Sequence, residues 1–152
     1  MMRRKDSELS QEASREILES NNYAVVSLID AEGLPYGVAL DYIYKEDCLY
    51  FHGAKEGRKT DAMKKNPRAC AVILGETKVI PNRFGREYVS AVAEGPITLI
   101  DDPEQKRKVM QWVVEHNSPD YLEKGYAVVE KLLERVLIYK MEIEKLSGKH
   151  GL

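Results

Sequence analysis

The chain has 152 residues, a mass of 17.3 kDa, 43% hydrophobic and 32% charged residues, so a single globular domain over residues 1–152 is expected, with a core that needs no disulfide or structural metal. Its 23 Lys and Arg against 25 Asp and Glu give a formal net charge of −2, which disfavours nucleic-acid binding. No apolar run approaches the roughly 18 residues of a membrane helix, and no apolar stretch follows the basic start, so neither a membrane anchor nor a secretory signal is expected and the predicted location is the cytoplasm.

The two cysteines, Cys48 and Cys70, are far apart in the sequence. Neither belongs to a Cys-x-x-Cys motif or to a Cys/His spacing that would bind zinc. Because the cytoplasm keeps thiols reduced, such residues are expected to be buried thiols. The sequence therefore predicts no metal site and no disulfide.

Hydrophobic patterns divide the first third of the chain into short elements. A helix is predicted from Ser10 to Asn21, since Ser10 can cap its N-terminus and apolar residues follow at helical spacing. Three antiparallel strands are expected next, because turn residues separate runs that are rich in β-branched and aromatic side chains. These strands are Tyr23–Ile29, Pro35–Tyr44 and Cys48–His52, the last one ending at Gly53.

The middle of the chain combines a helix with two strands. Residues 57–66 have a helical composition, and Pro67 ends the helix. A strand is predicted at Arg68–Leu74, followed by a loop and by a longer strand at Tyr88–Ile100.

Two features of the longer strand bear on its surroundings. Gly95 and Pro96 interrupt it and predict a bulge or a bend between two sheets. Ala91 and Ala93 share one face of it, and such small side chains fit the crowded interior of a barrel.

Two helices and a strand are predicted at the C-terminal end. An aspartate followed by Pro103 is typical of a helix start, and Trp112 and His116 lie on the apolar stripe of this helix, where they are expected to pack. A second helix restarts at Pro119, and Val136–Ile143 alternates as a last strand. Strands dominate without regular βα alternation, so the sequence favours an α+β antiparallel barrel with peripheral helices over a doubly wound parallel sheet.

The segment from Tyr50 to Thr60 joins a strand to a helix through glycines and is the most informative part of the sequence. It places Lys55, Arg58 and Lys59 around the predicted helix start. Free backbone N–H groups at a helix N-terminus attract a phosphate, and adjacent cationic side chains add charge-assisted hydrogen bonds. The segment therefore indicates an anion site; a solvated basic helix end is the alternative that the segment alone leaves open.

The same segment approaches the phosphate-binding loop of nucleotide hydrolases but departs from it. Gly53 is followed by four residues and then by Arg58-Lys59-Thr60, so arginine replaces the second glycine of the G-x-x-x-x-G-K-[ST] pattern. That glycine lets the loop wrap the phosphates, and the surrounding strands read as a meander rather than a parallel sheet. No G-x-G-x-x-G sequence occurs, so neither nucleotide hydrolysis nor a built-in dinucleotide-binding unit is expected.

Three pieces of the sequence, taken in order, resemble a known family. They are the strand Pro35–Tyr44 after an Asp-x-x-Gly turn, the segment Tyr50–Lys59, and Asn66-Pro67. As far as Ile100, the chain resembles the split-barrel flavoproteins related to pyridoxamine 5′-phosphate oxidase, and within them the branch that includes nitroimidazole-resistance proteins. The resemblance implies an antiparallel split β-barrel with Greek-key-like strands, and a homodimer with FMN at its interface.

The resemblance also implies which residues bind FMN. Arg58 and Lys59 match the basic pair that holds the FMN phosphate, and His52 and Gly53 match the strand end beside the ribityl chain and the ring. Ser90 matches a polar position that faces the cofactor from the long strand. The predicted set is completed by Lys55 of the same loop and by the strand whose backbone runs along the flavin ring, at Val38, Ala39 and Leu40.

The activity that the resemblance implies is that of an FMN-dependent oxidoreductase. NAD(P)H would give a hydride to the flavin, and the flavin would pass electrons to a small acceptor such as a nitro or quinone compound. His52 is a candidate catalytic residue that would hydrogen-bond the cofactor or move a proton near the reacting ring, with a satisfied strand-end histidine as the alternative.

Departures from the family pattern leave other activities open. The basic residues by which the parent oxidase binds pyridoxal phosphate and its C-terminal Trp and Arg signature are not recognisable, so oxidation of pyridoxamine phosphate is not expected. Two alternatives to the oxidoreductase remain. One is a non-enzymatic flavin-binding carrier or sensor, and the other is a relative that binds deazaflavin or haem.

Overall fold

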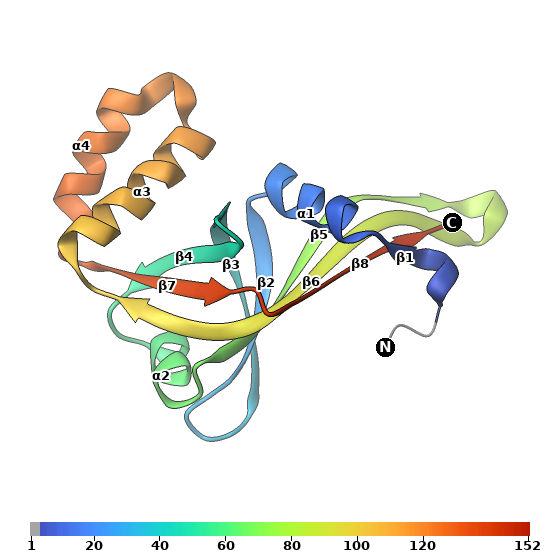
Figure 1. Ribbon diagram of the computed structural model, residues 1–152, viewed down its shortest axis with the longest axis horizontal. Helices are drawn as coiled ribbons and strands as arrows, with labels where there is room; N and C mark the ends of the chain where they lie inside the picture. The colour runs from blue at the N-terminus through green and yellow to red at the C-terminus, as the bar shows by residue number, and fades with distance from the viewer. Residues whose placement is uncertain (1–3) are drawn as a thin grey trace.

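The computed structural model describes residues 4–152, so the first three residues of the basic N-terminal segment lie outside the described residues. An antiparallel barrel carries helices at its periphery (Figure 1). The strands are β1 (Glu8–Leu9), β2 (Tyr23–Ile29), β3 (Pro35–Lys45), β4 (Cys48–Ala54), β5 (Arg68–Ile80), β6 (Gly85–Ile100), β7 (Val136–Glu142) and β8 (Lys145–Gly151). The helices are α1 (Gln11–Ser20), α2 (Arg58–Lys65), α3 (Pro103–Asn117) and α4 (Leu122–Leu132).

Six strands close the barrel in the order β6-β5-β2-β3-β4-β7, because β7 pairs with both β4 and β6. Every one of these pairings is antiparallel. β8 adds to the remaining edge of β6, and β1 adds to β8. The α3–α4 hairpin projects from one end of the barrel, beside β4 and β7 (Figure 1). The predicted α+β antiparallel barrel with peripheral helices is therefore confirmed.

β6 belongs to both walls of the barrel. Residues up to Glu94 pair with β5 on one side and β8 on the other, whereas residues from Ile97 onward pair with β7. The change of partner falls at Gly95 and Pro96, which confirms the predicted bend. Gly95 is buried against the backbone of Glu142, and an added Cβ atom would overlap the carbonyl oxygen of that residue.

The sheet separates two hydrophobic clusters. Inside the barrel, Phe51, Tyr139 and Ala93 are fully buried. On the outer side of β4 and β7, Tyr50 and Ile138 pack under α3 and α4. Successive residues of β4 therefore serve different clusters, which explains why its sequence is a continuous apolar run rather than an alternating one.

Two parts of the fold differ from the sequence prediction. The predicted loop between Leu74 and Tyr88 is mostly strand, because β5 and β6 continue to pair as an arm as far as Ile80 and Gly85. The segment after Ile143, which lies beyond the last predicted strand, forms β8 along β6. Since β8 contains two glycines, two lysines and no β-branched residue, its strand structure comes from its partner rather than from its own propensity.

We expect Gly95→Ala to destabilise the protein by at least about 2 kcal/mol, because the new methyl group has to displace the backbone of Glu142. Gly37→Ala is the matched control within a strand, since its methyl group would meet only Val25 within 4 Å, at 3.9 Å. Urea unfolding measures both free energies. Equal stability of the two variants would show that the bend has room for a side chain.

Candidate functional site

The ladder between β3 and β4 is short. Residues 42–45 of β3 pair with residues 48–51 of β4. Residues 35–41 of β3 pair with β2, and residues 52–54 of β4 pair with β7. These two stretches do not pair with each other. We call this unpaired end of the two strands, residues 37–41 and 52–54, the β3–β4 split.

The backbone of β3 offers hydrogen-bonding groups to the split. Tyr42 donates its backbone N–H to the carbonyl of Asn22 at 2.9 Å. The even-numbered residues of β3 therefore direct their backbone N–H and C=O groups toward β2. Because the direction alternates along an antiparallel strand, Gly37, Ala39 and Asp41 direct their N–H and C=O groups toward β4. Among the predicted residues of β3, Ala39 therefore has its backbone turned toward the split.

The two neighbours of Ala39 have a different environment. Val38 and Leu40 are half-buried, and their side chains pack against the interior of the barrel. Their backbone groups pair with β2. The structure therefore assigns Val38 and Leu40 to the barrel wall, from which they hold the strand in place.

The loop after β4 is held in shape by two buried hydroxyl groups. The hydroxyls of Thr60 and Tyr139 lie 3.0 and 2.8 Å from the carbonyl oxygen of Ala54, and 2.8 Å from each other. Thr60 and Tyr139 are both fully buried. A buried cluster of this kind is lost only at the cost of unpaired polar groups, so it fixes the path of the loop into α2.

The first turn of α2 lies next to this cluster. Gly57 precedes the helix with a φ of 121°, a conformation that favours glycine. The first backbone bond of the helix runs from the N–H of Asp61 to the carbonyl of Gly57 at 3.0 Å. Helix geometry therefore leaves the N–H groups of Arg58, Lys59 and Thr60 without an intrahelical acceptor, so the first turn of α2 has the donors that the predicted anion site needs.

Arg58 connects the first turn of α2 to the β2–β3 turn. Its Nη2 and Nε atoms donate to Oδ2 of Asp30 at 2.8 and 3.3 Å. Its guanidinium also stacks on Tyr36, with 4.1 Å from the guanidinium carbon to the ring centroid. Since 55% of the Arg58 side chain is exposed, it remains accessible to a ligand.

Lys59 and His52 adjoin Gly53 at the end of β4. A Cβ atom on Gly53 would lie 2.6 Å from Cε of Lys59, so glycine makes room for the lysine side chain. His52 is half-buried. Burial lowers the pKa of His52, and the positive charge of Lys59 lowers it further, whereas the carboxylate of Asp41 acts in the opposite direction. His52 is therefore mainly neutral at pH 7.

Two predicted residues are directed elsewhere. Lys55 pairs at 3.1 Å with Asp101, which also accepts a 2.7 Å hydrogen bond from the buried Lys106 at the start of α3. Ser90 lies on β6, with β5 and β2 between it and β3. Within one chain, the structure therefore gathers around the split and the adjoining loop a smaller set of predicted residues: Ala39, His52, Gly53, Arg58 and Lys59.

Asp30 is a part of this site that sequence reasoning missed. The Asp-x-x-Gly turn was a signal for Asp30, whose Oδ1 accepts the N–H groups of Glu32 and Leu34 at 3.0 and 2.9 Å. Its bond to Arg58 joins residues 28 positions apart. No pattern within either segment indicates such a pair.

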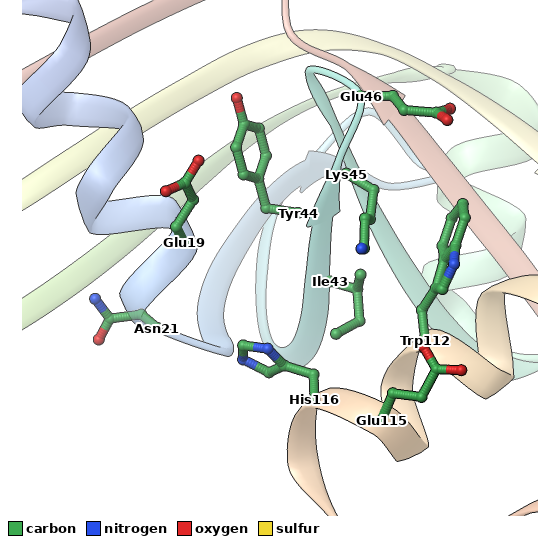
Figure 2. Close-up of a pocket in the computed structure, with 9 residues that line it drawn as sticks. All are labelled: Glu19, Asn21, Ile43, Tyr44, Lys45, Glu46, Trp112, Glu115 and His116. Carbon is green, nitrogen blue, oxygen red and sulfur yellow. The ribbon is translucent and has the colours of Figure 1, made fainter. Parts of the chain in front are cut away.

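A different cleft, of about 520 Å³, lies between the end of α1, the β3–β4 hairpin and α3 (Figure 2). Trp112 borders it and packs edge-on against Tyr50, with 5.5 Å between ring centroids. The ammonium groups of Lys45 and Lys108 lie 5.7 and 5.1 Å from the centroid of the Trp112 ring. The expected packing is confirmed for Trp112 and wrong for His116, which is exposed and lines the cleft instead of packing.

Other expectations concern thiols, metals and membranes. Cys48 and Cys70 are free, and burial raises the pKa of both thiols. Residues 4–152 include no group of three or more His, Cys, Asp or Glu side chains that could hold a metal ion. In the same range, every helix is too short or too polar to cross a membrane.

Comparisons with known proteins extend over nearly the whole chain. Residues 10–150 match the sequence model of a family described as pyridoxamine 5′-phosphate oxidase. No curated protein matches the chain.

Three solved structures share the fold at low sequence identity. A candidate 5-nitroimidazole antibiotic resistance protein from Bacteroides thetaiotaomicron is 23% identical, with a TM-score of 0.76 over 94% of this chain and 86% of that one. A flavocytochrome from Azotobacter vinelandii is 22% identical, with a TM-score of 0.83 over 100% and 72% of the two chains. A FAD- and haem-binding protein from Mycobacterium smegmatis is 20% identical, with a TM-score of 0.80 over 93% and 71%.

We expect His52 to titrate below the usual histidine pKa of about 6.5, because burial and Lys59 disfavour its protonated form. The unfolded chain then binds the proton more tightly, so the stability that His52 contributes is complete above pH 6.5 and declines as the pH falls below it. Lys59→Met should raise the pKa of His52, and Asp41→Asn should lower it. An NMR titration of the imidazole measures all three, and a pKa above 6.5 in the unsubstituted protein would contradict this account.

Proposed function

The chain belongs to the pyridoxamine 5′-phosphate oxidase family, and we propose that it is an FMN-dependent oxidoreductase that passes electrons from NAD(P)H to a small acceptor such as a nitro or quinone compound. One observation supports this proposal above all. The unpaired backbone of the β3–β4 split adjoins a helix start that bears two cations, Arg58 and Lys59. A flat ring with a phosphate tail needs such a combination.

The phosphate end of FMN fits the first turn of α2. Its charge at neutral pH is close to −2. The turn offers N–H groups without an intrahelical acceptor, together with the side chains of Arg58 and Lys59. The hydroxyl cluster of Thr60 and Tyr139 holds the loop in this shape. A rigid loop loses little freedom when the anion binds, so more of the interaction energy is available for affinity.

The ring end fits the split. An isoalloxazine ring has a polar edge of N–H and C=O groups, and the backbone groups of Gly37, Ala39 and Asp41 offer donors and acceptors of matching type. Bound FMN would supply the redox chemistry, accepting a hydride from NAD(P)H and returning two electrons to the acceptor. The imidazole of His52 belongs to β4, on the other side of the split from these groups, and would hold or move a proton there.

The two substrates would use the same face. The described residues contain no second nucleotide-binding unit beside the barrel. NAD(P)H would therefore visit the open side of the split, leave as NAD(P)⁺, and be followed by the acceptor. Such alternation predicts ping-pong kinetics, and the NAD(P)H that it needs would be available in the cytoplasm, the location we propose for the protein.

A second copy of the chain would complete the site. Large apolar side chains remain exposed on the outer face of β2 and β5, where Tyr23, Val25 and Leu74 are 58, 46 and 60% exposed. Contiguous apolar surface of this kind marks an interaction site. Ser90 lies directly opposite Leu74 in the sheet, so a homodimer through this face gives Ser90 a route to the cofactor of the partner.

A carrier or haem-binding role is the second candidate. Two of the similar structures are a flavocytochrome and a FAD- and haem-binding protein, and a neutral histidine such as His52 is what haem iron requires as a ligand. FAD has the same ring and a diphosphate in place of the terminal phosphate. Both alternatives use the same barrel, and the colour of the protein separates them.

The visible spectrum of the purified protein tests the function. We expect the visible absorbance of a flavin, which NADH or NADPH bleaches in the absence of oxygen, and we expect acid to release that flavin as FMN. Release of FAD would show that the cofactor is FAD and not FMN. A flavin that neither pyridine nucleotide reduces would indicate the carrier, and a Soret band would indicate haem. A colourless protein that fails to bind added FMN would refute the proposal.

Replacing Arg58 and Lys59 together by alanine should weaken FMN binding by about 100-fold or more, since hydrogen bonds to charged groups contribute about 1.5–3 kcal/mol each. Lys64→Ala combined with Lys131→Ala is the matched control, because it removes the same charge from two exposed helix positions. Fluorescence quenching of FMN gives the Kd, and circular dichroism confirms the fold. Unchanged affinity in the Arg58/Lys59 variant would refute the phosphate assignment.

A further inference from the structure

Asp30 is a buried carboxylate whose two oxygens have separate partners. Its relative exposure is 4%. Oδ1 accepts the backbone N–H groups of Glu32 and Leu34, whereas Oδ2 accepts both bonds from Arg58. The bond from Leu34 is the main reason that the pKa of Asp30 lies below its usual value, and Arg58 adds to it. The carboxylate is therefore charged throughout the physiological pH range, and its own orientation is set by the turn.

The β2–β3 turn and α2 form one rigid unit around this carboxylate. At the other end of α2, Lys65 donates to the carbonyl of Ala31 at 2.6 Å, and Asn66 donates to the carbonyl of Asp30 at 3.3 Å. Arg58 joins the turn to the first turn of the helix. The helix is thus attached to the turn at both ends, and Asp30 takes part in both attachments.

Asp30 uses only some of the N–H donors of the Arg58 guanidinium. A guanidinium has five N–H groups in a fixed plane, and Asp30 engages Nε and Nη2 on one edge of it. Tyr36 covers one face. These two contacts leave Nη1 and the second hydrogen of Nη2 directed away from Asp30, and the half-exposed side chain makes that edge accessible.

We propose that Asp30 is a positioning residue for the flavin phosphate: it holds the guanidinium of Arg58 so that the free edge faces the first turn of α2. This inference rests on the proposed FMN site. Without Asp30, the arginine would lose rotamer freedom when the phosphate binds, which weakens binding. With Asp30, the Arg58 side chain is already held in one rotamer before the phosphate binds, so binding costs less rotamer entropy. Lys59 supplies a second positive charge, so the site stays attractive to an anion despite the carboxylate.

Riboflavin provides the readout, because it has the ring and the ribityl chain of FMN but no phosphate. Asp30→Asn keeps a carbonyl oxygen for the two turn bonds and removes the charged acceptor of Arg58. We expect it to raise the Kd for FMN about five- to tenfold, an amount equivalent to losing one oriented hydrogen bond, and to leave the Kd for riboflavin unchanged. A purely structural defect would weaken both flavins alike and would overturn the inference.

Asp61→Asn is the matched control. Asp61 is exposed in the first turn of the same helix, so this substitution removes one negative charge near the phosphate without touching Arg58. If Asp30 acted through its charge alone, both variants would bind FMN more tightly. The inference requires opposite behaviour, with weaker FMN binding in Asp30→Asn and equal or tighter binding in Asp61→Asn, and tighter binding in both would overturn it.

Arg58→Lys tests the same geometry should Asp30→Asn fail to fold. It keeps the positive charge, but one ammonium cannot contact Asp30 along one edge and a phosphate along another. We expect it to lose most of the preference for FMN over riboflavin, and full retention of that preference would overturn the inference. An unsubstituted protein with no such preference would instead refute the proposed phosphate site, so the two failures are distinguishable.

Discussion

The feature on which the site depends is the early end of the β3–β4 ladder. Backbone N–H and C=O groups need partners, and a barrel usually supplies them from the next strand. Here β4 pairs with β7 along its whole length and β3 pairs with β2, but the ladder between β3 and β4 ends at Tyr42 and Phe51. The backbone groups of Ala39 and Asp41 that have no partner in β4 lie on the side of β3 that faces the basic start of α2. One interruption in the pairing thus leaves a polar backbone edge, which is the edge that the proposed site assigns to the flavin ring.

Local sequence predicted the parts of this site that are local in the chain. Gly53, Arg58 and Lys59 lie within seven consecutive residues, so a strand, a glycine and a helix start were enough to place them together. The Asp30–Arg58 pair and the Thr60–Tyr139 pair join residues 28 and 79 positions apart, and only the folded barrel brings them into contact. β8 was not predicted for a related reason: its glycines and lysines do not favour a strand by themselves, and they form one only by pairing with β6.

Helix α3 is attached by side-chain contacts to the loop after β4. Lys106 is almost fully buried, and it donates to Asp101 and to the carbonyl of Val136 at the start of β7. Asp101 also pairs with Lys55. A buried cation needs such partners, and here they connect the start of α3 to the loop after β4. The loop is therefore held from the turn side by Arg58 and from the helix side by Lys55.

The shared strand β6 has a consequence for how the two walls of the barrel are held together. Both walls of the barrel contain this strand, so they cannot slide apart as separate bodies. Any change in the distance between the walls therefore has to bend β6 itself, and the strand changes its partner at Gly95, where an added side chain has no room. The walls are thus joined by the covalent chain of β6 as well as by the hydrogen bonds between strands.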